Sequence, residues 1–237
     1  MSFIIHRADT RGTTKTSWLN SQHTFSFADY YDPERMGFGA LRVLNDDTIL
    51  AGQGFPKHGH RDMEIITIPL SGAVRHQDSL GNTSVVQTGE VQIMSAGTGV
   101  IHAEHNASDI EPLSLLQIWI EPKVRGIAPR YDQKIFDTSY RQDRFQMIIS
   151  PEHDDTMLWI NQDAYLSRIV CSEKSAIAYH LHSAKHGAYV FVIRGVLRVS
   201  GELLRARDGV GVWDVPDISW HAEEDAEVLV LEVPMED

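Results

Sequence analysis

The chain contains two copies of one short pattern, and this repeat limits the possible folds more than any other feature. The first copy, Gly52–Gly72, reads GQGFPKHGHRDMEIITIPLSG: two histidines one residue apart, then a β-branched apolar run and a glycine. The second copy, Tyr179–Gly195, reads YHLHSAKHGAYVFVIRG. Two later segments also correspond, because TGEVQIMSAGTGVIHAE and DGVGVWDVPDISWHA each reach a histidine near their end. The repeat predicts two copies of one structural module in tandem.

The segments between these motifs are short, rich in β-branched residues and separated by Gly, Asn or Asp. Such spacing is typical of antiparallel sandwiches and barrels, and helical periodicity is scarce. A chain of 237 residues can form one large domain or two of about a hundred residues each. We therefore expect an all-β chain with a first domain at 1–123, a connecting segment at 124–145 and a second domain at 146–237.

Charge and composition exclude several classes of partner. The net charge of −12 and the absence of a long basic run argue against direct contact with nucleic acid, because phosphate binding needs clustered Lys and Arg. No apolar run has the length of a membrane span or of a signal peptide, so we expect no membrane contact. The single cysteine, Cys171, fits a reducing compartment. We expect a cytoplasmic protein.

Two pairs of potential ligands lie about forty residues apart. His58 and His60 are separated by one residue, as are His102 and Glu104. Residues i and i+2 of a strand face the same side, so each pair projects together, whereas His105 points away. Three imidazoles and one carboxylate suit iron, manganese, cobalt, nickel, copper or zinc, and the lack of a thiolate argues against a structural zinc site. The sequence predicts one divalent transition metal ion here, with iron as the first choice.

Other histidines lack partners at ligand spacing. His6, His23 and His76 are therefore expected to be structural.

The motifs around these pairs resemble those of the cupin superfamily. Gly52-x5-His58-x-His60-x3-Glu64 is similar to the first cupin motif, and GVIHAEHN, residues 99–106, is similar to the second. The resemblance implies a jelly-roll β-barrel for each half, so that the fold is two tandem cupin domains.

A closer resemblance, over most of the N-terminal half, is to the pirin family of two-domain cupins. The segments HTFSFADYYDP, MGFGALRVLNDD, HGHRDMEI and QIMSAGTGVIHAEHN are similar to pirin segments in that order. Carried over to this sequence, the pirin metal ligands are His58, His60, His102 and Glu104. Glu64 is then interpreted as a supporting or structural carboxylate.

The resemblance also implies an activity. Pirins are associated with quercetin 2,3-dioxygenase activity, in which dioxygen opens the heterocycle of a flavonol and carbon monoxide is released. Glu104 would be the catalytic residue, accepting the proton of the flavonol 3-hydroxyl. We expect an apolar pocket, with Phe27, Phe38, Ile93 and Met94 as candidate lining residues.

The alternative is a protein without enzymatic activity. Pirins also act as metal-dependent, redox-responsive binding proteins that modulate a transcription factor or a metabolic enzyme, so a protein partner is the second hypothesis. Fold and ligands alone do not separate the two, because one cupin site supports many reactions.

The C-terminal half leaves a second metal site open. His180, His182 and His186 keep the spacing of the first motif, and His221 stands where the second motif has its histidine. Pirin C-terminal domains generally lack a complete ligand set, so a scaffold without metal is the default expectation.

Overall fold

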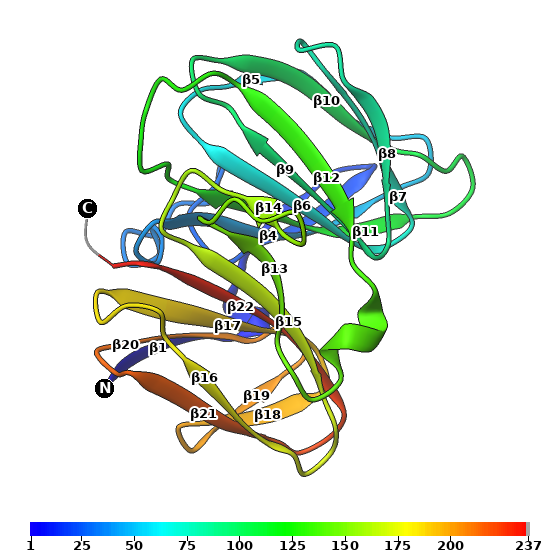
Figure 1. Ribbon diagram of the computed structural model, residues 1–237. Coiled ribbons are helices and arrows are strands. Elements are labelled where there is room, and N and C mark those ends of the chain that lie inside the picture. Colours follow the sequence, from blue (N-terminus) through cyan, green and yellow to red (C-terminus); the bar gives the residue numbers. More distant parts are fainter. Residues whose placement is uncertain (236–237) are drawn as a thin grey trace.

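The computed structural model describes residues 1–235, which form two β-barrels stacked on each other (Figure 1). Each barrel consists of one seven-stranded sheet and one four-stranded sheet. All strand pairs are antiparallel except that of β13 with β14. The predicted all-β fold of two tandem cupin barrels is confirmed. Among these residues no helix is long and apolar enough to cross a membrane.

The first barrel is formed by a large sheet of order β12-β9-β6-β11-β4-β3-β2 and a small sheet of order β5-β10-β7-β8. The large sheet comprises β2 (Gly12–Lys15), β3 (Leu19–His23), β4 (Leu41–Ile49), β6 (Glu64–Ser71), β9 (Glu90–Ser95), β11 (Leu113–Ile120) and β12 (Arg130–Ile135). The small sheet comprises β5 (Gly54–His60), β7 (Ala73–Asp78), β8 (Thr83–Gln87) and β10 (Val100–Asn106).

The second barrel repeats this arrangement with the orders β1-β20-β17-β22-β15-β13-β14 and β16-β21-β18-β19. Its large sheet comprises β1 (Ser2–His6), β13 (Gln146–Ser150), β14 (Leu158–Trp159), β15 (Tyr165–Cys171), β17 (His186–Arg194), β20 (Gly209–Trp213) and β22 (Ala226–Pro234). Its small sheet comprises β16 (Ala176–His180), β18 (Val196–Val199), β19 (Glu202–Arg205) and β21 (Asp217–Ala222). Residues 1–235 also contain two short 3-10 helices, η1 (Ala8–Thr10) and η2 (Thr138–Arg141).

Sheet membership departs from the expected division of the chain at two points. The first strand, β1, pairs with β20 of the second barrel. The segment 124–145 is not wholly irregular, because it contains β12, which pairs with β9 of the first barrel. Each barrel therefore gains a strand from beyond the boundary that composition indicated, and the boundaries themselves stay predictions.

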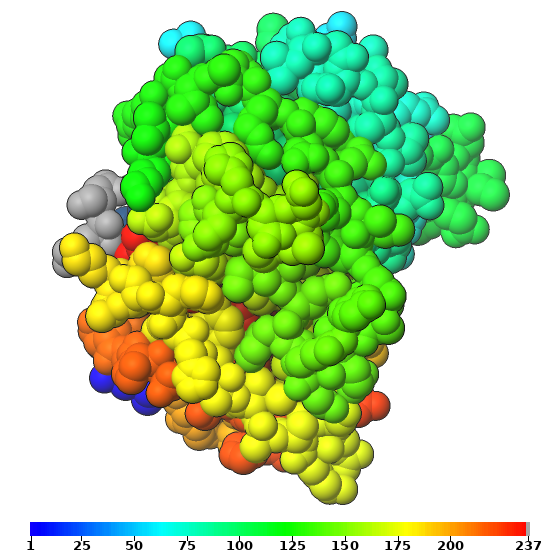
Figure 2. Space-filling model, viewed as in Figure 1, coloured from blue at the N-terminus to red at the C-terminus, as the bar shows by residue number. Residues whose placement is uncertain are grey.

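The main apolar core lies between the barrels rather than inside the first one. The outer face of the first large sheet contributes Ile66 and Ile118, and that of the second contributes Phe191 and Leu229, all with almost no solvent exposure. The residues that alternate with them on the same strands point into the barrels. Figure 2 shows the two halves in continuous contact across this junction.

Truncation of Ile118 tests this central core. Because Ile118 is fully buried, Ile118→Ala should lower the free energy of unfolding by about 2–5 kcal/mol, measured by urea denaturation. Ile110→Ala is the matched control, since Ile110 is 84% exposed and should change stability by less than about 0.5 kcal/mol. Equal effects of the two substitutions would contradict the placement of the core.

Candidate metal centre

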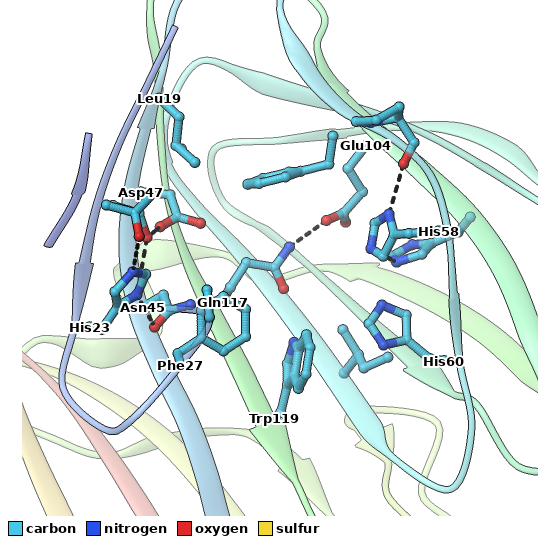
Figure 3. Close-up of a pocket in the computed structure, with 17 residues that line it drawn as sticks. Leu19, His23, Phe27, Asn45, Asp47, His58, His60, Glu104, Gln117 and Trp119 are labelled. Atoms are coloured by element: carbon cyan, nitrogen blue, oxygen red, sulfur yellow. Dashed lines mark hydrogen bonds between the residues drawn. The ribbon is translucent and has the colours of Figure 1, made fainter. Parts of the chain in front are cut away.

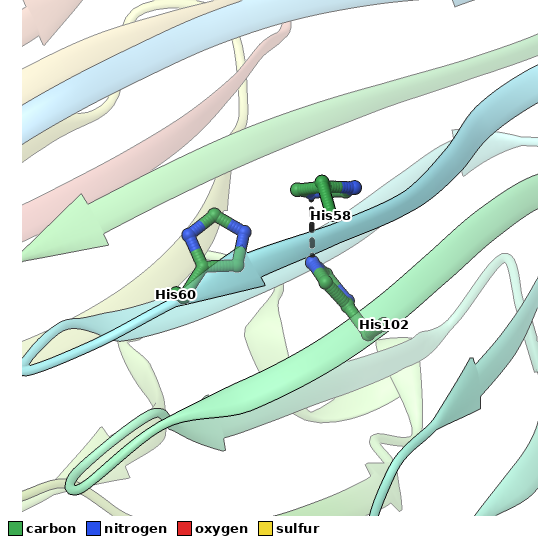
Figure 4. Close-up of side chains that lie close together, drawn as sticks. All are labelled: His58, His60 and His102. Atoms are coloured by element: carbon green, nitrogen blue, oxygen red, sulfur yellow. Dashed lines mark hydrogen bonds between the residues drawn. The ribbon is translucent and has the colours of Figure 1, made fainter.

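Three histidines from two paired strands converge at the mouth of the first barrel (Figure 4). Strands β5 and β10 are antiparallel neighbours, with His58 directly opposite His102. Their ring centroids lie 4.4 Å apart, and the ring of His60 lies 4.8 Å from that of His58 and 4.9 Å from that of His102. One potential ligand atom from each residue lies within 4.8 Å of the other two. The first pair seen in the sequence thus forms one cluster with His102 of the second pair.

The hydrogen bond of His58 leaves one of its nitrogens free for a metal. Nδ1 of His58 lies 2.8 Å from the carbonyl oxygen of Pro56, which can only accept, so Nδ1 carries the proton and Nε2 carries a lone pair. Nε2 of His102 lies 3.0 Å from this Nε2. Two nitrogens in adjacent positions around a metal ion, each bonded at about 2.1 Å, are about 3 Å apart. The observed separation fits a shared ion.

Burial keeps two of these imidazoles neutral. Desolvation, followed by the neighbouring charges of His102 and His58, lowers the pKa of His60 to about 4. Desolvation, followed by the charges of His58 and His76, lowers the pKa of His102 to about 3. A metal ligand must be deprotonated, so both rings are ready to bind at neutral pH.

Glu104 lies next to His102 but in a polar cage of its own. Its Oε1 accepts hydrogen bonds from Thr67 at 2.9 Å and Gln92 at 2.7 Å, and its Oε2 accepts one from Gln117. These donors come from β6, β9 and β11, which surround the carboxylate inside the barrel. The potential ligand atoms of Glu104, His102 and His76 lie within 4.8 Å of one another, whereas Glu104 is not grouped in this way with His58 and His60.

A close backbone approach supports this corner of the site. The register between β5 and β10 shifts between His102 and Glu104. There, a Cβ on Gly54 would lie 2.3 Å from the carbonyl oxygen of Glu104, so only glycine fits.

His76 is nearer to the site than its sequence position indicates. It lies opposite Glu104 on β7, its ring centroid is 5.5 Å from that of His102, and it stacks on Tyr131 at 4.6 Å. Its Nε2 lies 3.1 Å from the carboxylate of Asp78. The sequence predicts that His76 is structural, because it lacks partners at ligand spacing along the chain. Strand pairing nevertheless brings it within 4.8 Å of ligand atoms of His102 and Glu104, which spacing along the chain does not reveal. The alternation of His76 with Asp78 was the available signal.

The histidine cluster opens into a cavity of about 360 Å³ inside the first barrel (Figure 3). Of the four predicted lining residues, Phe27 lines it. Phe38 and Ile93 lie instead in the core between the barrels, and Met94 lies in a small cluster with Ile65. The apolar lining residues are Leu19, Phe27, Ala28, Phe55, Pro56, Ile65 and Trp119.

A polar network covers the wall of the cavity away from the histidine cluster. Ser21 and His23 of β3 lie opposite Asp47 and Asn45 of β4, and Thr14 of β2 lies beside them. His23, expected to be only structural, lines the cavity together with these four residues. This wall was missed because no motif marks it.

Two other predicted positions lie away from the cavity. Glu64 is buried, and it accepts hydrogen bonds from Ser95 of the first barrel at 2.8 Å and from the backbone N–H of Asn161, in the second half of the chain, at 3.3 Å. His6 also lies between the halves, with Nδ1 2.9 Å from the hydroxyl of Tyr189.

The histidines of the C-terminal half do not form a comparable cluster. His182 and His186 each contact the carboxylate of Glu232, at 2.8 and 2.7 Å, whereas His180 contacts Asp217 at the surface. His221 is exposed and faces solvent. The barrel interior is filled by an apolar cluster that includes Tyr179, Val190, Val228, Ile218 and Trp220. Within residues 1–235, the groups of three or more potential ligands whose ligand atoms all lie within 4.8 Å of one another are in the first barrel.

Two barrels of this topology in tandem, with a histidine cluster inside the first, define a two-domain cupin. Comparison with known families agrees: residues 5–120 match the model described as Pirin, and residues 147–233 match that of the quercetinase C-terminal cupin domain. The chain belongs to the pirin family.

Several bacterial relatives cover nearly the whole chain. A protein named quercetin 2,3-dioxygenase from Escherichia coli is 47% identical over 97% of this chain and 98% of its own length. A pirin-like protein from Caulobacter vibrioides is 43% identical over 94% of this chain and 96% of its own. The crystal structure of the bacterial pirin YhhW from Escherichia coli in complex with nickel(II) is 45% identical, with a TM-score of 0.93 and coverage of 98% and 99%.

Glu232 gives a pH-dependent prediction. Burial alone would raise the pKa of Glu232, but hydrogen bonds from His186, His182 and Tyr179 outweigh it and hold the pKa below the usual 4.5. Such a carboxylate stabilises the fold above about pH 4.5, and this contribution is lost as the pH falls through the folded pKa. Glu232→Gln should lower the free energy of unfolding at pH 7 by about 1–3 kcal/mol, because it leaves donors unpaired.

Urea denaturation of wild type and variant between pH 7 and pH 3.5 measures the effect. The difference in free energy of unfolding between wild type and Glu232→Gln should be constant above about pH 4.5 and become smaller below it. A difference that does not change with pH would contradict the ionised state of Glu232.

Proposed function

We propose that this protein is a metal-dependent dioxygenase that opens the heterocycle of a flavonol such as quercetin and releases carbon monoxide. The observation that carries the proposal is the convergence of His58, His60 and His102 at one end of an aromatic-lined cavity of about 360 Å³. A cavity of this size is in the range of small-molecule sites. The names of several bacterial relatives, which include quercetin 2,3-dioxygenase, support the choice of substrate.

The proposed cofactor is one divalent transition metal ion held by His58, His60, His102 and Glu104. Neutral imidazoles and a carboxylate are a donor set that iron, manganese, cobalt, nickel, copper and zinc accept. Iron remains our first choice, and the nickel(II) in the YhhW structure supports a divalent ion in the family. When bound, such an ion would supply a Lewis acid for the reaction of the flavonol with dioxygen, and iron would supply redox capacity as well.

Glu104 is proposed to accept the proton of the flavonol 3-hydroxyl. The O–H bond breaks, its electron pair stays on the substrate oxygen, and the proton moves to the carboxylate. Thr67, Gln92 and Gln117 hold that carboxylate from three strands, so its orientation is fixed before substrate arrives. Both oxygen atoms of dioxygen enter the products, and one ring carbon leaves as carbon monoxide.

The aromatic wall orients a planar substrate. Trp119 lies edge-on to His60 at 4.9 Å between ring centroids, and Phe27 lies edge-on to Trp119 at 5.3 Å. Edge-to-face contacts of this kind fix the positions of the rings.

A cytoplasmic location stays a prediction from the sequence.

Removal of two ligands should abolish metal binding. We expect the double variant His58→Ala/His60→Ala to contain less than about a tenth of the wild-type metal, because too few neutral donors remain at the site. Metal content is measured by inductively coupled plasma mass spectrometry, and the fold by circular dichroism. His105→Ala is the matched control: His105 lies on the opposite face of the same strand as His102. Wild-type metal content in the double variant would overturn the ligand assignment.

Glu104→Gln separates base catalysis from metal binding. The amide keeps an oxygen but cannot take a proton at neutral pH, so turnover of quercetin should fall about hundredfold or more while metal content falls far less. Oxygen uptake by protein loaded in turn with iron, manganese, cobalt, nickel, copper or zinc gives the rates, with a chelator as the negative control. Unchanged turnover would remove Glu104 as the base. No turnover with any metal would favour the metal-dependent binding protein instead.

A further inference from the structure

Asp47 is a buried carboxyl group at the wall of the cavity, without a cationic partner. Its side chain lines the cavity and is 2% exposed to solvent. Ser21 donates a hydrogen bond to Oδ1, and among residues 1–235 no other group donates to the carboxyl and no Lys, Arg or His forms an ion pair with it. Figure 3 shows Asp47 on the far side of the cavity from His58 and His60.

The neighbour of Asp47 on the same strand is arranged in the opposite way. Asp46 points to the other face of β4, where Arg11 and Arg207 lie 3.3 and 3.5 Å from its carboxylate. Burial of an unpaired carboxyl costs free energy that an apolar residue such as leucine would not. A carboxyl group retained at a cavity wall without a cation therefore indicates a ligand group that it meets.

The imidazole of His23, near Asp47, is held by its neighbours on both ring nitrogens. His23 Nδ1 lies 2.9 Å from Oδ1 of Asn45, which can only accept, so Nδ1 carries the proton. Nε2 of His23 then accepts from the hydroxyl of Thr14 at 2.9 Å. His23 is fixed as a neutral ring, whereas the carboxyl of Asp47 keeps hydrogen-bonding capacity at this wall. Another lining group with free capacity is the amide oxygen of Gln117, which has no hydrogen-bond partner within residues 1–235.

A row of rings joins this wall to the histidine cluster. The ring centroids of His23 and Phe27 lie 5.2 Å apart, those of Phe27 and Trp119 lie 5.3 Å apart, and those of Trp119 and His60 lie 4.9 Å apart. A rigid planar ligand that lies along this row has one end at the histidine cluster and the other at the wall that contains His23 and Asp47. Flavonols have this shape and carry phenolic hydroxyls on their outer rings.

We infer that Asp47 determines specificity by holding a phenolic hydroxyl of the substrate at the end of the cavity remote from the histidine cluster. The inference rests on the proposed flavonol substrate and deepens it. The hydrogen bond fixes which way the flavonol lies along the aromatic row, and so which of its oxygens meets His58, His60 and His102.

Asp47 can make this contact whether its carboxyl group is ionised or protonated. Burial raises the pKa of Asp47 to about 7. The hydrogen bond from Ser21 acts in the opposite direction, and the negative charges of Asp46 and Glu104 add to the increase. A phenolic hydroxyl both donates and accepts, so it pairs with the carboxylate as donor and with the neutral acid as acceptor.

The test compares two flavonols on the metal-loaded protein. Quercetin carries hydroxyls on both outer rings, whereas 3-hydroxyflavone carries only the 3-hydroxyl. In Asp47→Leu, we expect Kd for quercetin to rise and kcat/KM to fall about tenfold or more, while both constants for 3-hydroxyflavone change less than about threefold. Asp47→Asn, which keeps a hydrogen-bonding oxygen, should recover part of the loss.

Asp46→Asn is the matched control, because it changes the same strand on the face away from the cavity, and it should not alter the ratio between the two flavonols. Metal content and melting temperature are measured for each variant. Equal losses on quercetin and 3-hydroxyflavone would overturn the role of Asp47.

Binding separates this inference from the dioxygenase proposal. If wild type binds quercetin without turnover and Asp47→Leu weakens that binding selectively, the proposed activity fails and the role of Asp47 is supported. If wild type binds neither flavonol, both are overturned.

Discussion

The contact between the two seven-stranded sheets is the interaction on which the rest of the structure depends. Both sheets turn an apolar face to this junction, where residues such as Leu44 and Ile118 meet Tyr189 and Leu231 with almost no solvent exposure. Because side chains alternate along a strand, the same strands that supply this core also supply the barrel interiors. Much of the stability of the first barrel thus comes from its outer face, and its interior is free to serve another purpose.

The two interiors show what this freedom allows. The first barrel places Asn45, Asp47, Glu104 and Gln117 around its cavity, together with the histidines. The second fills the corresponding space with apolar side chains, and Glu232, a fully buried carboxylate there, accepts hydrogen bonds from His182, His186 and Tyr179. The repeat in the sequence therefore gave rise to one barrel with room for a ligand and one that packs as a scaffold.

The sequence predicted the features that depend on local spacing. Strand parity places His58 and His60 on the same face of their strand, and the short β-branched segments indicate two barrels. The sequence could not predict contacts that depend on which barrel a strand joins or on which strands are neighbours in a sheet. The placement of β1 in the second barrel and of His76 beside Glu104 depends on long-range register, which periodicity within one segment does not carry. The prediction that Phe38 lines the cavity was wrong for the same reason. The sequence around Phe38 does not reveal whether its side chain faces the cavity or the core between the barrels.

The buried polar groups of the first barrel have a common physical explanation. A carboxylate in a low-dielectric interior needs several donors, and Glu104 receives them from Thr67, Gln92 and Gln117. Asp47 has a single internal donor, which is why it stands out as a contact for a ligand. In this account the first barrel is built around two ends of one substrate, with the metal at one end and a hydrogen-bonding carboxyl at the other.

The central claim is that one metal ion is held by the histidine cluster of the first barrel. An anomalous difference map from a crystal of the metal-loaded protein, collected at the absorption edge of the bound element, tests it most directly. The account predicts one strong peak bonded at about 2.1 Å to nitrogens of His58, His60 and His102 and to an oxygen of Glu104. A peak among the histidines of the second barrel, with none between β5 and β10, would contradict it.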